Sequence, residues 1–242
     1  MALLRRGTPE DPLELAQALA ALAIDYAWGV KERTEGIELM EESLSLFRRL
    51  DNRLGAGATL RDMGRFQHIW GRLRLSQKSY EESLRILADI DPLSSVQSAF
   101  LLGATLTIRG QYALAEVLLR RSITLFSTHY ETNLMANANL GLGSLYVSTG
   151  KFEEAESFFG RAHTIYAPVG LTRVIAGGFY GSTPGVLARL RGRPDAEQML
   201  LDELAEGRQT GNPSRIAFNL RKSTVSAQSA YRFSFSVAYD VA

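Results

Sequence analysis

The chain of 242 residues contains no cysteine. This absence excludes disulfides, thiolate metal ligands and a cysteine nucleophile, and it fits a reducing, cytoplasmic environment. Histidine is also scarce: His68, His129 and His163 lie far apart, and none has a second histidine or a carboxylate at metal-ligand spacing on the same helix face. The sequence therefore predicts no metal site, and we find no motif for a cofactor.

Neither sign of charge is in excess, and no hydrophobic run is long. The 27 Lys and Arg residues nearly balance the 26 Asp and Glu residues, for a net charge of +1, so overall charge does not attract nucleic acid or a membrane surface. No run approaches the roughly 18 apolar residues of a membrane span, and the start MALLRRGTPEDP lacks the apolar segment of a signal peptide. We expect a soluble, cytoplasmic protein.

Basic residues do gather locally between Arg48 and Lys78. Arginines commonly solvate the outer faces of helices, so this local excess is weaker evidence for a nucleic-acid partner than for an ordinary helix surface. Acid–base catalysis is not indicated either. Glu41 and Glu42 are adjacent, and adjacent residues on a helix point away from each other. The segment Gly141-Leu142-Gly143 lies inside a predicted helix with no strand before it, unlike a nucleotide loop.

The chain does contain a regular arrangement of small and large residues, clearest between Ala136 and Val169. A small residue at Gly143 lets two helix backbones approach closely, while Tyr146 and Phe159 fill the space beside them. Gly150 supplies the left-handed conformation that ends the first helix. The segment therefore predicts one helical hairpin.

The same arrangement recurs along the chain. Glu41-Glu42-Ser43-Leu44 returns 40 residues later as Glu81-Glu82-Ser83-Leu84. A small–large–small set occupies the second helix of four successive hairpins: Gly36, Met40, Ser43; Ser76, Tyr80, Ser83; Ala115, Leu119, Ser122; Ala155, Phe159, Ala162. Glycines that end the first helices recur at Gly71, Gly110, Gly150 and Gly192. Self-similarity at this period indicates a stack of hairpins.

This register predicts the organisation of the whole chain. Residues 1–11 are the end of a preceding helix or a cap, residues 12–220 form the repeat domain, and residues 221–242 form a non-repeat tail whose residues 231–241 alternate as in a strand. We expect hairpins at about 12–50, 53–90, 94–129, 131–169 and 171–208, with a partial sixth from 213. Asp11 and Pro12 suit the start of the first helix. The Thr183-Pro184-Gly185 segment should kink or divide the helix between Leu171 and Arg191.

The hairpin between Ala136 and Val169 resembles a tetratricopeptide repeat, whose pattern places Leu, Gly, Tyr, Ala, Phe and Ala at these offsets. Asn139 stands where that pattern prefers Trp, and Ala167 where it prefers Pro. The resemblance covers about residues 12–210 and is most specific in the third and fourth hairpins. It implies an all-α, right-handed superhelix of about five hairpins. The period also resembles the repeat arrays of large ATP-dependent bacterial transcription regulators and related signalling proteins.

Tetratricopeptide proteins generally bind ligands in a concave groove lined by the first helix of each repeat. Carried onto this register, the resemblance implies the following groove residues: Asp25, Trp28, Arg61, Arg65, His68, Gln97, Phe100, Thr107, Asn137, Leu140, Ser144, Phe179 and Arg189. Arg61 and Arg65 are one helical turn apart, so both guanidinium groups could reach one carboxylate or phosphate. Leu140 and Ser144 replace two residues of the family's carboxylate clamp, which argues against recognition of a peptide C-terminus.

We therefore expect a non-enzymatic scaffold that holds a protein or peptide in this groove. The alternative is an effector-sensing arm of a bacterial signalling or transcription regulator, whose groove binds a small molecule. Apolar faces at the two ends of a solenoid also leave self-association open.

Overall fold

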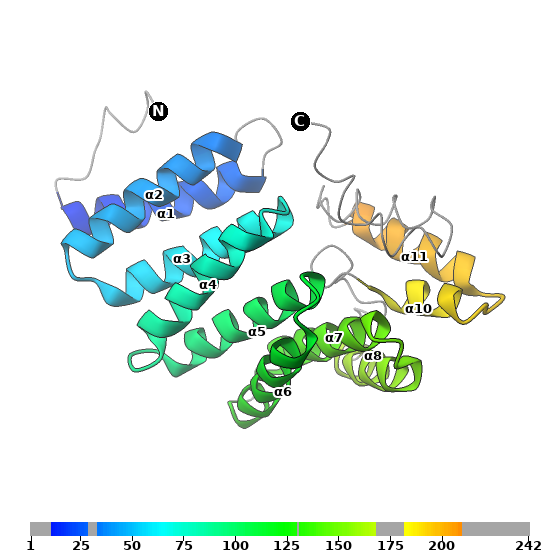
Figure 1. Ribbon diagram of the computed structural model, residues 1–242. Coiled ribbons are helices and arrows are strands. Elements are labelled where there is room, and N and C mark those ends of the chain that lie inside the picture. The colour runs from blue at the N-terminus through cyan, green and yellow to red at the C-terminus, as the bar shows by residue number, and fades with distance from the viewer. Residues whose placement is uncertain (1–10, 29–32, 130, 168–181, 210–242) are drawn as a thin grey trace. The chain divides into compact units, whose positions relative to one another are not determined.

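The structure is a computed structural model that describes residues 11–28, 33–129, 131–167 and 182–209. This part of the chain is helical and contains no strand, which confirms the predicted all-α class. Ten helices are seen there, labelled as in Figure 1. They are α1 Pro12–Trp28, α2 Arg33–Arg49, α3 Arg53–Ile69, α4 Leu73–Leu87, α5 Pro92–Ile108, α6 Tyr112–Thr128, α7 Thr132–Ser148, α8 Phe152–Tyr166, α10 Pro184–Leu190 and α11 Ala196–Gln209.

Consecutive helices pair as hairpins, as in a tetratricopeptide-like fold. Contacts divide the described helices into two compact units: the first runs to Ser98 without the segment His68–Leu73, and the second combines that segment with the chain from Ala99 onward. In the first unit α1 packs on α2, and in the second α7 packs on α8 and α10 on α11 (Figure 1). None of the described helices is long and apolar enough to cross a lipid bilayer.

The turns inside the hairpins use glycine where the backbone is left-handed. Gly150 has φ +75°, and Lys151 N donates to the Tyr146 carbonyl at 2.8 Å, a bond that closes the end of α7. The other three glycines expected to end helices also have positive φ: Gly71, Gly110 and Gly192. The helix-ending role predicted for Gly150 is therefore confirmed.

In the second, third and fourth hairpins the paired helices approach closely at a glycine that faces a large side chain. A Cβ atom at Gly64 would lie 2.7 Å from Tyr80 Cε1, and one at Gly103 would lie 2.9 Å from Leu119 Cγ. Gly143 meets the ring of Phe159 in the same way. All twelve members of the predicted small–large–small set are buried. These contacts explain why the register repeats, because any side chain at the glycine would push the two helices apart.

Serines take the small positions of the first two hairpins and add hydrogen bonds between helices. Ser43 Oγ donates to the Ala16 carbonyl at 2.8 Å, and Ser83 Oγ donates to the Gly57 carbonyl at 2.7 Å. Both serines are fully buried, and a buried hydroxyl is costly unless it is bonded. These bonds link α2 to α1 and α4 to α3.

In the second unit α6 packs on the following hairpin, α7–α8. A Cβ atom at Gly141 of α7 would lie 2.8 Å from Leu119 Cδ2 of α6. The Tyr146 hydroxyl of α7 donates to Glu116 Oε1 at 2.5 Å, and Arg120 contacts the same hydroxyl. Successive hairpins of this unit are therefore joined by an apolar contact beside a polar cluster.

The starts of α1 and α10 each have a side chain that caps the helix. Asp11 Oδ1 accepts a hydrogen bond from Leu13 N at 2.8 Å, as expected for an N-cap before Pro12. Thr183 Oγ1 accepts one from Val186 N at 3.2 Å, so Thr183 and Pro184 begin α10 as a helix of seven residues. The rest of the predicted divided helix, the partial sixth hairpin from 213, the cap at 1–10 and the tail at 221–242 lie outside the described residues.

Candidate ligand-binding surface

The predicted groove residues differ widely in accessibility. Asp25 is exposed, and five others are half-buried: Arg61, Arg65, Gln97, Asn137 and Arg189. Five are buried within the chain: His68, Phe100, Thr107, Leu140 and Ser144. The side chain of Trp28 and the residue Phe179 lie outside the described part of the structure. Only the exposed and half-buried members offer a ligand substantial surface.

Three of the accessible members come together on α3 and α5 in the first unit. Arg61 Nη1 donates to Gln97 Oε1 at 3.2 Å, and Arg65 follows one turn after Arg61 on α3. We call Arg61, Arg65 and Gln97 the arginine surface. The two arginines therefore lie one turn apart on α3, as their spacing predicts, and the side-chain amide of Gln97 from the next hairpin contacts Arg61.

One carboxylate, Asp62, accompanies both arginines. Its Oδ1 lies 3.3 Å from Arg65 Nη2 and 3.8 Å from Arg61 Nε. The side chains of Arg61 and Arg65 are 20% and 36% exposed. Two positive charges against one negative charge leave this group of three side chains with a net charge of +1. Asp91 also lies within electrostatic range of Arg61. Both arginines remain partly accessible to solvent.

Tyr80 lies within electrostatic range of both arginines, but it does not add a negative charge to them. Burial, the largest cause, raises its pKa well above the ordinary value, although the arginines act in the opposite direction. The phenol is therefore neutral at physiological pH. The hydrogen-bonding capacity of Arg65 is also not used up, since its buried Nε atom has no partner among the described residues.

Two of the buried members have roles inside the second unit. His68 Nδ1 lies 2.8 Å from Thr105 Oγ1, and that hydroxyl in turn donates to the Leu101 carbonyl at 3.0 Å. Phe100 packs edge-on against Phe126 of α6, with ring centroids 6.2 Å apart. Both side chains thus serve packing and interhelical bonding.

The fourth hairpin uses Asn137 in a similar internal contact. Its Oδ1 accepts a hydrogen bond from the Tyr166 hydroxyl of α8 at 2.9 Å. Leu140 and Ser144, one turn apart on the same helix, are only 2% and 1% exposed. The arginine surface is therefore the part of the predicted groove where charge, accessibility and proximity coincide.

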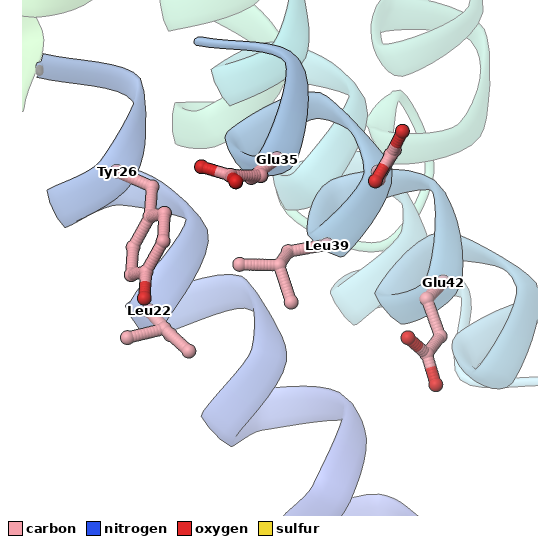
Figure 2. Close-up of a pocket in the computed structure, with 6 residues that line it drawn as sticks. Leu22, Tyr26, Glu35, Leu39 and Glu42 are labelled. Carbon is pink, nitrogen blue, oxygen red and sulfur yellow. The ribbon is translucent and has the colours of Figure 1, made fainter. Parts of the chain in front are cut away.

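Two features of the first unit are not among the predicted groove residues. Asp62 is the shared counter-ion of the arginine surface, and its place between the arginines was the available signal. Glu35, Glu38 and Glu42 line a groove between α1 and α2, and Figure 2 labels Glu35 and Glu42 there. Their spacing by one and two turns puts all three on one face of α2. In the described residues no group of three or more His, Asp or Glu side chains is arranged to hold a metal ion.

One protein-family model matches part of the chain. The family model described as "Tetratricopeptide repeat" matches residues 95–167, which contain most of α5 and all of α6, α7 and α8. No curated protein sequence matches the chain. These matched helices form the third and fourth hairpins, where the residue pattern is most typical of the repeat.

Solved structures show the same fold over a longer stretch. The crystal structure of aspartyl phosphate phosphatase F from Bacillus subtilis superposes with a TM-score of 0.65 at 12% identity and covers 91% of this chain. This chain in turn spans 58% of the length of that protein. At this identity the likeness concerns the fold alone. Together the family match, the hairpin register and the fold show that the chain contains tetratricopeptide repeats at residues 95–167 and that its described part has a tetratricopeptide-like helical fold.

Proposed function

We propose that this chain is a non-enzymatic helical-repeat scaffold that binds an acidic segment of a protein or peptide at the arginine surface. Tetratricopeptide repeats generally mediate contacts between proteins, and the coarse role of an interaction scaffold rests on the repeats at residues 95–167. The identity of the ligand class rests on Arg61 and Arg65.

The observation that carries the proposal is the pair of arginines one turn apart with a single shared carboxylate. Arginine can bind a carboxylate through two parallel hydrogen bonds, and charge-assisted bonds of this kind are stronger than neutral ones. Gln97 already holds Arg61 from the neighbouring hairpin, so less side-chain entropy is lost when a ligand binds. An acidic side chain is the group that this surface recognises best.

The test measures binding of short acidic peptides by fluorescence anisotropy. We expect an array of peptides rich in Asp and Glu to include binders, and the same peptides with Asn and Gln to bind at least about tenfold more weakly, which corresponds to about 1.4 kcal/mol. The variant Arg61→Glu/Arg65→Glu should lose the binding of the acidic peptides by a similar factor.

A matched control is available on α4. Lys78 and Arg85 are exposed, so Lys78→Glu/Arg85→Glu makes the same change in net charge away from the arginine surface. Equal losses for the two double variants would show that binding follows bulk charge and would overturn the proposal. Saturable thermal stabilisation by a small carboxylate metabolite, without peptide binding, would favour the effector-sensing alternative instead.

The non-enzymatic part of the proposal has its own test. The Bacillus subtilis neighbour is named as a phosphatase of aspartyl phosphate, and that activity belongs to that protein. We expect the present chain to leave acetyl phosphate, a small acyl phosphate, unhydrolysed above the rate in buffer. Turnover that disappeared in a variant of one residue would contradict a purely binding role.

A further inference from the structure

The first hairpin carries a groove between α1 and α2. Six residues line it: Leu22 and Tyr26 from α1, and Glu35, Glu38, Leu39 and Glu42 from α2. Figure 2 shows Leu39 pointing from α2 toward Leu22 and Tyr26. Leu39 is 4% exposed, whereas the three glutamates are exposed. The groove therefore has an apolar floor and an acidic rim.

The repeat register shows what covers the corresponding face elsewhere in the chain. Aligning Met40 with Phe159, and Ser43 with Ala162, makes Leu22 equivalent to Gly141 and Leu39 equivalent to Phe158. In the fourth hairpin both equivalents face α6. Gly141 lies against Leu119, and the Arg120 guanidinium carbon lies 5.7 Å from the centre of the Phe158 ring.

The α1–α2 groove is thus the equivalent of a surface on which a helix packs. The helix that packs on the fourth hairpin presents a leucine followed by an arginine, Leu119 and Arg120. Its leucine meets the first-helix position and its arginine meets the second-helix position. A helix placed likewise on the first hairpin would set its apolar residue over Leu22 and a longer side chain over Leu39.

The charges of the groove indicate which helix it accepts. Glu35, Glu38 and Glu42 have no ion-pair partner among the described residues. Their equivalents in the fourth hairpin are Glu154, Ser157 and Arg161, whose charges cancel. The first hairpin therefore replaces a neutral set with three negative charges. An incoming helix with Lys or Arg beside its apolar anchor would neutralise them, and electrostatic complementarity of this kind selects partners.

We propose that the α1–α2 groove is a docking site for a basic amphipathic helix of another polypeptide, on the face equivalent to the one that α6 covers on α7 and α8. Because Leu22 replaces Gly141, this helix lies farther from α1 than α6 lies from α7. The occupant inserts an apolar side chain between Leu22 and Leu39 and directs basic side chains to Glu38 and Glu42. This site differs from the arginine surface in its hairpin, its charge and its ligand.

The experiment uses the full chain and a fluorescent peptide of residues 112–128 carrying Glu116→Lys. This peptide keeps Leu119, Arg120 and Arg121 and replaces its one carboxylate with a basic side chain. We expect saturable binding by anisotropy, at least about tenfold weaker for the peptide that also carries Leu119→Asp. Binding should weaken as salt is raised, because the rim charges are exposed.

Neighbouring residues on α2 supply a matched pair of variants. Glu42 lines the groove, while exposed Glu41 points about 100° away around the helix. Glu42→Lys should weaken binding at least about fivefold, whereas Glu41→Lys, with the same change in charge, should leave it nearly unchanged. Circular dichroism checks that both variants keep the helical content of the parent chain.

Three outcomes would overturn the proposal. The peptide fails to bind, the Glu41 and Glu42 variants weaken it equally, or sedimentation shows that the chain self-associates through this face and that Glu42→Lys dissociates it. The last result would make a second copy the occupant. Arg61→Glu/Arg65→Glu should leave binding of the basic peptide intact, so failure of this site and failure of the arginine surface are distinguishable.

Discussion

At the scale of single residues, the polar cluster of Glu116, Arg120 and Tyr146 shows how α6 is joined to α7. Glu116 Oε1 accepts from the Tyr146 hydroxyl at 2.5 Å and from Arg120 Nε at 2.9 Å. These bonds, the one from Tyr146 first, lower the pKa of Glu116 below its ordinary value of 4.5. A carboxyl with a lowered pKa stabilises the folded state above its ordinary pKa, and this contribution is lost as pH falls through the lowered pKa.

This linkage predicts a pH-dependent effect of Glu116→Gln. At pH 7 the variant should lose about 1 kcal/mol of unfolding free energy, the usual net contribution of a hydrogen bond to a charged group at a partly exposed site. As pH falls below 4.5 the difference from the parent chain should shrink, because the parent carboxylate becomes protonated. Urea denaturation across this range measures it. Glu154→Gln, at an exposed position, is the control that should show little difference at any pH.

At the scale of a helix and its partner, the structure distinguishes two kinds of helical glycine: one kind lies in a tight contact between helices, and the other faces open space. Gly143 of α7 lies against the ring of Phe159, which is itself only 5% exposed and has little room to move. Gly160 of α8 is exposed, and a Cβ atom there would meet no atom within 4 Å. The two positions therefore form a matched pair for the same substitution.

Gly143→Ala should destabilise the chain by about 1 to 3 kcal/mol, because the added methyl overpacks the contact with Phe159. Gly160→Ala should stabilise it by about 0.5 to 1 kcal/mol, because alanine loses less backbone entropy than glycine in a helix. Thermal and urea unfolding give both values. Shifts of the same sign at the two positions would show that the helix contact is not as close as described.

The turn after α7 gives a further prediction at this scale. Gly150 has φ +75°, and a Cβ atom there would meet no atom within 4 Å, so a substitution encounters backbone strain without a steric clash. Gly150→Ala should cost about 1 to 2 kcal/mol. Gly150→Asn should cost less, since asparagine tolerates the left-handed region better. Equal unfolding free energies for the two variants would contradict this account of the turn.

At the scale of the whole molecule, the two proposed surfaces carry opposite charges on a chain whose net charge is only +1. The nearly neutral net charge therefore does not describe the local surfaces. The charged side chains of the arginine surface are positive, and those of the α1–α2 groove are negative. Each should attract its ligand independently of overall charge. The class of partner is set by the local surface and not by the composition.

Measuring the binding of both peptides to each variant tests whether the two surfaces act independently. Arg61→Glu/Arg65→Glu should weaken the acidic peptide alone, and Glu42→Lys should weaken the basic helix alone. The triple variant should show the sum of the separate effects in free energy, since the residues share no partner. Loss of both ligands in either variant would mean that the two sites are coupled or that the variant is misfolded, and circular dichroism decides between these.

The sequence by itself determined the hairpins and their register. Helix-ending glycines such as Gly110 and Gly150, and small–large pairs such as Gly143 with Phe159, act over short distances along the chain, so their pattern can be read directly. The match to the tetratricopeptide repeat over residues 95–167 falls on the hairpins where this pattern is most complete.

Only the tertiary structure decided which of the predicted groove positions are accessible. The periodicity of a helix is the same whether a neighbour covers a position or not, so the sequence does not distinguish Phe100 and His68 from Arg61. In the structure Phe126 contacts Phe100, and Thr105 contacts His68. The α1–α2 groove has the same origin. The spacing of its glutamates is visible in the sequence, but its apolar floor exists only where Leu22 and Leu39 meet across two packed helices.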